Sequence, residues 1–139
     1  MTHSTAELGR RASEEIWGKG NTAAIDQLYA YDYVNLSPAP GLPNDREGIK
    51  MEVEMYRSAF PDMAVEIHDI VADESKCVVR YTASGTHEGD LMGMPPTGRS
   101  VKIDGVSIAH IENGKIVREY ALNDTMSLME QLGALPEAA

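Results

Sequence analysis

Residues 100–122 carry the sequence SVKIDGVSIAHIENGKIVREYAL, which predicts two antiparallel strands joined by a tight turn. Apolar and polar side chains alternate on both sides of residues 112–115, and Asn113-Gly114 is the strongest short signal for a β-hairpin. We therefore expect strands over residues 100–111 and 115–122, followed by a short helix over residues 127–132.

The sequence before this hairpin changes character at residue 63. Residues 63–69, 71–72 and 77–86 continue the strand-like pattern, whereas residues 6–17, 23–31 and 45–59 show apolar side chains at helical spacing. Asp45 is expected to cap the third helix, and Phe60-Pro61-Asp62 to end it. Helices followed by a run of antiparallel strands indicate an α+β fold. We expect the curved sheet to wrap around the helices and enclose an apolar pocket.

Composition narrows the class of protein. The 139 residues are expected to form a single domain over residues 1–139. Acidic residues outnumber basic ones 22 to 12, and the net charge of −10 argues against nucleic acid or an anionic membrane as a partner. We expect a cytoplasmic protein, because no apolar run spans a bilayer and the N-terminus lacks a signal-peptide pattern. The single cysteine, Cys77, excludes an internal disulfide.

No strong catalytic motif is present: the chain has no phosphate-binding glycine loop, no HExxH and no GxSxG. The four histidines are not at metal-ligand spacings, so acid–base chemistry by carboxylates and histidine is what remains. Asp124 lies between an apolar strand and an apolar helix, where desolvation would raise its pKa and make it a general base. The alternative is that Asp124 only caps the short helix.

The segment between residues 85 and 99, GTHEGDLMGMPPTGR, predicts an Ω-like loop at the edge of the sheet. His87 stands at the root of this loop. It is a candidate donor to a substrate oxygen, and the alternative is that it only ties the loop down.

Taken together, these segments resemble the SnoaL-like polyketide cyclases of the nuclear-transport-factor-2-like superfamily. The resemblance rests on FPD at 60–62, GTHEG at 85–89, GMPPTGR at 93–99, NGKI at 113–116, and Asp124 followed by QLG at 131–133. It implies a cone-shaped barrel with a deep apolar pocket, dimerised through the outer face of the sheet, and no metal or organic cofactor. It also implies that Asp124 removes an acidic proton from a polyketide ester, after which the enolate closes a ring by aldol addition.

The resemblance carries over further residues as expected substrate contacts. Trp17 matches an aromatic wall residue, Tyr33 and Asn35 match the pocket mouth, and Tyr120 stands where the wider family often has tryptophan. Gly105 and Ser107 stand where characterised anthracycline cyclases have a glutamine and a histidine that contact the ligand. We therefore expect a wider cavity that lacks those polar contacts. Ser107 then becomes a candidate donor to the enolate.

Three functions follow from these features. The first is a cofactor-free cyclase or isomerase with Asp124 as the general acid/base and His87, Tyr33 or Ser107 as hydrogen-bond donors. The second is a protein that binds a hydrophobic small molecule without changing it. The third, epoxide hydrolysis, is disfavoured because Arg80 is not followed two residues later by aspartate. For all three we expect a homodimer without a cofactor.

Overall fold

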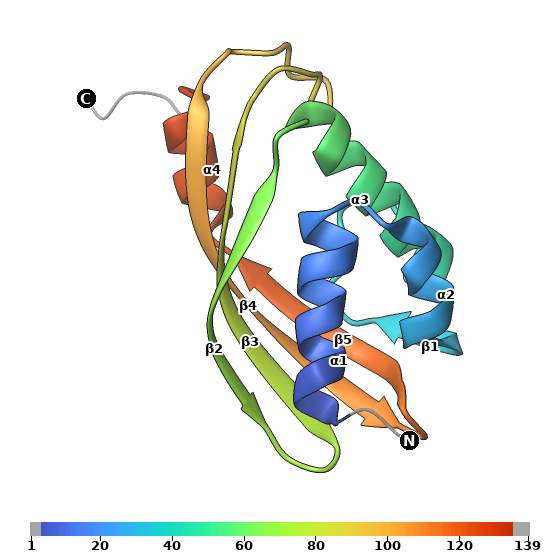
Figure 1. Ribbon diagram of the computed structural model, residues 1–139. Helices are drawn as coiled ribbons and strands as arrows, with labels where there is room; N and C mark the ends of the chain where they lie inside the picture. Colours follow the sequence, from blue (N-terminus) through green and yellow to red (C-terminus); the bar gives the residue numbers. More distant parts are fainter. Residues whose placement is uncertain (1–3, 135–139) are drawn as a thin grey trace.

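The computed structural model describes residues 4–134 and consists of a helical layer against one face of a sheet (Figure 1). The helical elements are α1 (Thr5–Arg11), η1 (Ala12–Gly18), η2 (Thr22–Ala24), α2 (Ile25–Leu28), α3 (Arg46–Ala59) and α4 (Thr125–Gln131). The strands are β1 (Tyr29–Asn35), β2 (Ala64–Ala72), β3 (Lys76–Thr86), β4 (Ser100–Glu112) and β5 (Lys115–Asn123).

The five strands form one open, mixed sheet in the order β1-β5-β4-β3-β2. The central pairs are antiparallel as expected, but β1 runs parallel to β5, so the prediction of an all-antiparallel sheet was wrong at this edge. The sheet ends at β1 and β2, and the expected barrel does not close.

The hairpin between β4 and β5 confirms the turn predicted from the sequence. Asn113 and Gly114 both have positive φ, 52° and 74°, as a type I′ turn requires. This backbone twist matches that of the flanking strands, so the two residues fix how β4 and β5 begin to pair.

The N-terminal helices differ from the prediction in two places. The expected helix over residues 6–17 begins as α1 but continues from Ala12 to Gly18 as a π-helix. The expected helix over residues 23–31 ends at Leu28, and the following YAYDYVN segment forms β1. β1 was missed because Tyr29 follows Ile25 and Leu28 at helical spacing, although Tyr29 is buried from a strand.

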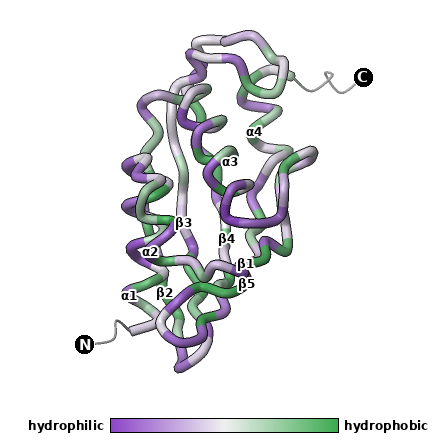
Figure 2. Tube along the Cα trace, turned by 90° about the vertical axis from the view of Figure 1, so that its right-hand side faces the viewer, coloured by the Kyte–Doolittle hydropathy of each residue, from purple (hydrophilic) through white to green (hydrophobic). Residues whose placement is uncertain are grey.

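The third helix was predicted correctly. Asp45 caps α3 by accepting a hydrogen bond from the Gly48 N–H at 3.0 Å. Ile49 and Val53 bury the inner face of α3 in the main core, together with residues of α1 and β3. The hydropathy colouring of Figure 2 shows apolar segments in both the helices and the strands that face them.

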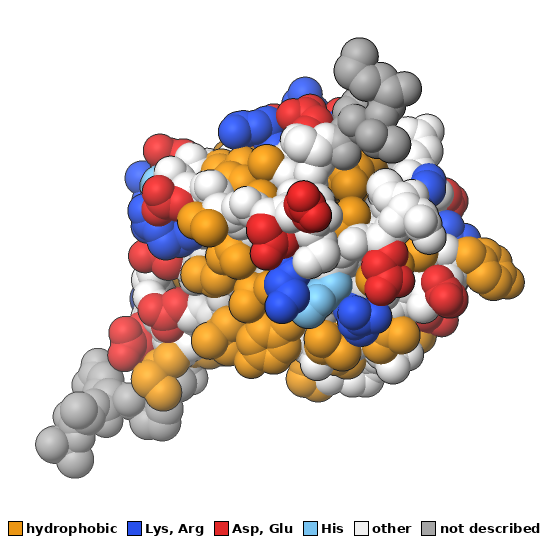
Figure 3. Space-filling view, turned by 90° about the horizontal axis from the view of Figure 1, so that it is seen from below, with side chains coloured by type: hydrophobic (Ala, Val, Ile, Leu, Met, Phe, Trp, Pro, Cys, Tyr) orange, Lys and Arg blue, Asp and Glu red, His pale blue; other side chains and the backbone are white. Residues whose placement is uncertain are grey.

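The outer surface is mixed in character. Seen from below in Figure 3, apolar side chains lie beside acidic and basic ones, so neither sign of charge covers this end of the molecule. Within residues 4–134, no helix is long and apolar enough to cross a membrane.

Candidate active site

A cavity of about 170 Å³ lies between the inner face of the sheet and the helices. Its apolar and aromatic wall includes Ala12, Trp17, Ile49, Tyr56, Phe60, Met63, Val79, Tyr81, Val101, Ile103 and Leu128. Its polar groups include Ser13, Asn35, Ser37, Glu52, Ser84, Ser107, Glu119, Asn123 and Thr125. An apolar cavity with a few converging polar groups is the usual form of a small-molecule site.

The π-helical segment η1 brings Ser13 and Trp17 to the cavity. Trp17 packs against Tyr56 of α3, with ring centroids 6.4 Å apart and planes at 58°. Arg57 fixes the end of η1, because its Nη1 donates to the carbonyl oxygens of Trp17, Gly18 and Met63 at 3.0, 3.2 and 3.2 Å. This guanidinium therefore joins η1, α3 and the start of β2.

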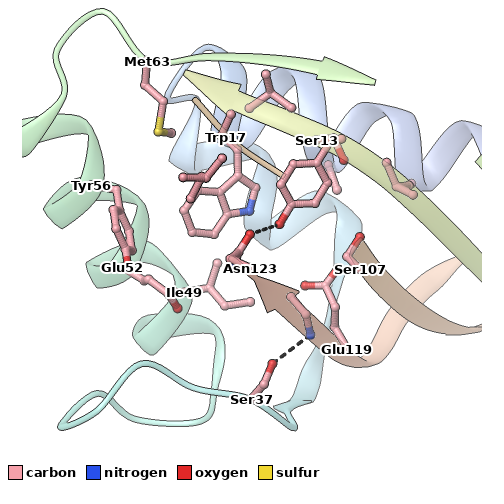
Figure 4. Close-up of a pocket in the computed structure, with 18 of the residues that line it drawn as sticks. Ser13, Trp17, Ser37, Ile49, Glu52, Tyr56, Met63, Ser107, Glu119 and Asn123 are labelled. Carbon is pink, nitrogen blue, oxygen red and sulfur yellow. Dashed lines mark hydrogen bonds between the residues drawn. The ribbon is translucent and has the colours of Figure 1, made fainter. Parts of the chain in front are cut away.

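Glu119 of β5 places a carboxyl group inside the cavity (Figure 4). The hydroxyls of Tyr29 and Tyr33 donate to its Oε1 at 3.2 and 3.4 Å. The two tyrosine rings meet edge to face, 4.7 Å apart at 89°, which holds both hydroxyls on one side of the carboxyl group. Within residues 4–134 the second oxygen, Oε2, has no hydrogen-bond partner and is left for a ligand.

Burial raises the pKa of Glu119 to about 7. The two tyrosine hydrogen bonds favour the ionised form and oppose this shift, while the negative charge of Glu52 adds to it. The net effect leaves a carboxyl group whose two protonation states are both populated near neutral pH. Such a group can take a proton and return it.

Glu52 enters the cavity from α3, opposite the sheet wall that carries Glu119 (Figure 4). Burial also raises the pKa of Glu52. Within residues 4–134 its carboxyl group makes no ion pair, whereas Glu47 on the same helix pairs with Lys50 at 3.2 Å. The cavity therefore holds two carboxyl groups in partly desolvated surroundings.

Tyr81, Gly105 and Asn123 occupy paired positions on three neighbouring strands. The Tyr81 hydroxyl donates to Asn123 Oδ1, and this bond passes over Gly105. A Cβ atom at position 105 would lie 2.4 Å from Asn123 Oδ1 and 2.6 Å from the Tyr81 hydroxyl. The expected widening of the cavity at Gly105 was thus wrong, since the Tyr81–Asn123 pair fills that space.

Comparisons with known proteins identify the family of the chain. The family model described as SnoaL-like polyketide cyclase matches residues 7–132. The chain belongs to this family. Aklanonic acid methyl ester cyclase DauD from Streptomyces sp. (strain C5) is 28% identical over 127 residues, which cover 88% of this chain and 78% of the relative. Nogalonic acid methyl ester cyclase from Streptomyces nogalater is also 28% identical, over 116 residues that cover 82% of this chain and 87% of the relative.

Solved structures show the same fold. TsrD from Streptomyces laurentii superposes with a TM-score of 0.83 at 26% identity, covering 93% of this chain and 94% of TsrD. IdmH from Streptomyces antibioticus superposes with a TM-score of 0.81 at 29% identity, covering 94% of this chain and 99% of IdmH.

Within this SnoaL-like fold, some of the expected substrate-contact residues line the cavity and others do not. Trp17, Asn35 and Ser107 lie on the cavity wall. Tyr33 is buried behind the wall and reaches the site through its hydrogen bond to Glu119. Tyr120 is 44% exposed and is not a wall residue, because neighbouring side chains of a strand point to opposite faces and Glu119 and Ala121 face the cavity.

Asp124 follows β5 directly and caps α4. Its Oδ1 accepts from the Ser127 N–H at 3.0 Å, and its own N–H donates to the Asp104 carbonyl oxygen. Its neighbours Asn123 and Thr125 line the cavity, while Asp124 itself is exposed and lies outside the cavity wall. The structure thus shows the capping role for Asp124 and does not bring it together with Glu119.

His87 is fully buried at the root of the loop rather than on the cavity wall. Its Nδ1 accepts from the Thr97 N–H at 3.2 Å, and its ring packs on Phe60 with centroids 5.4 Å apart. These contacts tie residues 87–97 to the core, which was the alternative interpretation of this histidine.

Two further observations concern charged side chains. Within residues 4–134, no three His, Cys, Asp or Glu side chains lie close enough together to hold a metal ion. Arg80, the residue weighed for epoxide hydrolysis, is exposed and pairs with Asp69 at 2.7 Å on the surface.

Sequence reasoning missed Glu119 and Glu52 as site residues. The signal for Glu52 was its position in α3, one turn after Ile49 and one turn before Tyr56 on the inner face. Glu119 was hidden by a bulge in β5. Ile116 pairs with Ile111, but Arg118 already pairs with His110, so one extra residue turns Glu119 inward.

Proposed function

We propose that this chain is a cofactor-free acid–base cyclase that closes a ring in a polyketide-type carbonyl compound, with Glu119 as the general acid/base. The single observation that supports this best is the Glu119 carboxyl group in the cavity, with Oε1 held by two tyrosines and Oε2 without a hydrogen-bond partner among residues 4–134. The homologues named as methyl ester cyclases support the reaction class. The apolar wall supports a hydrophobic substrate.

The reaction needs no co-reactant. Glu119 Oε2 takes a proton from a carbon between two carbonyl groups, and the electron pair of that C–H bond forms the enolate. The enolate carbon then attacks another carbonyl carbon of the same molecule, so that a C–C bond forms and a C=O π bond becomes an alkoxide. The alkoxide takes back a proton, and the product is an isomer of the substrate. The Ser107 hydroxyl, on the same wall as Glu119, would donate to the enolate oxygen.

Asp124 is the second candidate for the proton transfer, on the strength of the family resemblance. Its side chain would have to leave the cap of α4 to reach the cavity. The two assignments are separated by Glu119→Gln and Asp124→Asn, because both substitutions keep the shape of the side chain and remove the charge. Glu54 lies on the exposed face of α3, so Glu54→Gln is the matched control.

The experiment is turnover of aklanonic acid methyl ester and nogalonic acid methyl ester, followed by chromatography and mass spectrometry of a product of equal mass. We expect Glu119→Gln to lower kcat by about 10²–10⁴-fold, the range for loss of a general base, and Glu54→Gln to leave it unchanged. Loss of activity in Asp124→Asn but not in Glu119→Gln would identify Asp124, and not Glu119, as the general acid/base. If both esters bind and are recovered unchanged, the result would favour a protein that binds a hydrophobic small molecule without changing it.

We also propose that the chain forms a homodimer through the outer face of the sheet. Val106 and Leu122 are paired across β4 and β5 on this face, beside Tyr120, and their exposed fractions are 37, 65 and 44%. Sedimentation equilibrium of the wild type and Leu122→Glu tests this. We expect a dimer that the glutamate weakens, and a monomeric wild type would contradict the proposal.

A further inference from the structure

The cavity is charged with one sign only. Its wall contains the carboxyl groups of Glu52 and Glu119, and among residues 4–134 no lysine, arginine or histidine lines it. Arg57 is not a wall residue, and its Nη1 is bonded to three carbonyl oxygens. A ligand in this cavity therefore meets negative charge without a positive counterpart from the described protein.

The proposed reaction uses the carboxyl group of Glu119 and does not use that of Glu52. Glu119 is held by two tyrosine hydroxyls, whereas Glu52 has no ion pair or hydrogen bond within residues 4–134. An ionised side chain in partly apolar surroundings is unfavourable until an opposite charge approaches it. A ligand cation would supply that charge, and a ligand anion would be repelled by it.

Aromatic rings stand around the same space. Trp17 and Tyr56 pack against each other on the side of the cavity that carries Glu52 (Figure 4). Tyr81 of β3 also lines the cavity. The faces of such rings attract a positively charged nitrogen, most strongly when water is excluded. Carboxylate and aromatic faces thus favour the same kind of ligand group.

We propose that Glu52 is the specificity-determining residue of this cavity, and that it selects hydrophobic ligands carrying a protonated amine while excluding carboxylates. This inference rests on the proposed function only in taking the cavity as the substrate site. Among polyketide-type carbonyl compounds it favours those with a basic nitrogen over neutral esters, with the nitrogen positioned so that the amine meets Glu52 and the acidic carbon meets Glu119 across the cavity.

The test uses three naphthalene probes of equal size that differ in charge: 2-(aminomethyl)naphthalene, 2-(hydroxymethyl)naphthalene and 2-naphthoate. Isothermal titration calorimetry at pH 8 gives the Kd of each for the full chain. We expect the amine to bind about tenfold more tightly than the alcohol, as a partly desolvated cation among aromatic rings should, and the naphthoate to bind at least tenfold more weakly than the alcohol.

Two variants test whether Glu52 causes the preference for the amine over the alcohol. We expect Glu52→Gln to reduce the difference between amine and alcohol to less than about threefold, while the control Glu54→Gln keeps it. The proposal is overturned if the alcohol binds as tightly as the amine, if the amine preference survives in a folded Glu52→Gln variant, or if none of the probes binds. Because binding needs no turnover, an inactive protein that still prefers the amine would refute the cyclase proposal and leave this one standing.

Discussion

The Glu119 carboxyl group should make the folded protein less stable as pH rises, and removing its charge should stabilise the fold. Glu119→Gln keeps an oxygen that can accept from Tyr29 and Tyr33, and it replaces an ionisable group by a neutral one of the same shape. The proposed general base would then be lost from a protein that is more stable than the wild type.

The magnitude follows from the pKa of Glu119, which is raised from 4.5 to about 7 on folding. A raised carboxyl pKa means that the folded state binds the proton more tightly than the unfolded state does. Stability therefore falls as pH increases between about 4.5 and 7. Above this window the charged group costs about 3 kcal/mol, which Glu119→Gln should recover at pH 8 and not at pH 4.5.

Urea unfolding followed by the fluorescence of Trp17, the single tryptophan, measures this free energy between pH 4.5 and 8. We expect the wild type and Glu54→Gln to lose stability over this range and Glu119→Gln to lose less. A Glu119→Gln variant that is no more stable than the wild type at pH 8, with the same pH dependence, would refute the reasoning that this carboxyl group is desolvated in the fold.

Three other substitutions test the packing around the cavity, each by its urea-unfolding free energy. Gly105→Ala should destabilise by about 1–3 kcal/mol, because its Cβ would push apart the Tyr81–Asn123 hydrogen bond, and an unchanged value would mean that this pair moves freely. Arg57→Met should cost about 2–3 kcal/mol through the loss of charged hydrogen bonds to three carbonyl groups, and a loss below 0.5 kcal/mol would argue against that role. Asp124→Ala should cost about 1 kcal/mol and Asp124→Asn little, since asparagine also caps helices, so equal losses would contradict a pure capping role.

The fold could be predicted from the sequence where local signals agreed. Asn113-Gly114 defined the hairpin, and Asp45 with the Phe60-Pro61 pair bounded α3, because turn and cap preferences act within a few residues. β1 could not be predicted in this way. Its parallel pairing with β5 joins residues 84 to 87 positions apart, and no local pattern reports such a contact.

The site was harder to predict for a related reason. Continuing the alternation from Ile116 would turn Arg118 and Tyr120 inward and Glu119 outward. The bulge in β5 reverses this by one residue, which explains why Glu119 was missed. Tyr120 was expected to touch the substrate because of the family resemblance, and the same bulge turns its side chain to the outer face. The place of Asp124 between an apolar strand and an apolar helix, and then the family resemblance, indicated Asp124, whereas burial, which only the folded chain shows, indicates Glu119.

The π-helical form of η1 has a consequence for how this site could diverge among descendants of the gene. A π-helix accommodates an extra residue per turn compared with an α-helix, so loss of one codon within Ala12–Gly18 would restore the ordinary pitch. Because the wide turn absorbs the extra residue, a deletion before Trp17 would leave the direction of Trp17 nearly unchanged and would remove one residue from the segment upstream of it. One deletion far in sequence from the acid–base residue could thus shorten the binding wall in a single genetic step, without moving Trp17 or changing any side chain that handles the proton.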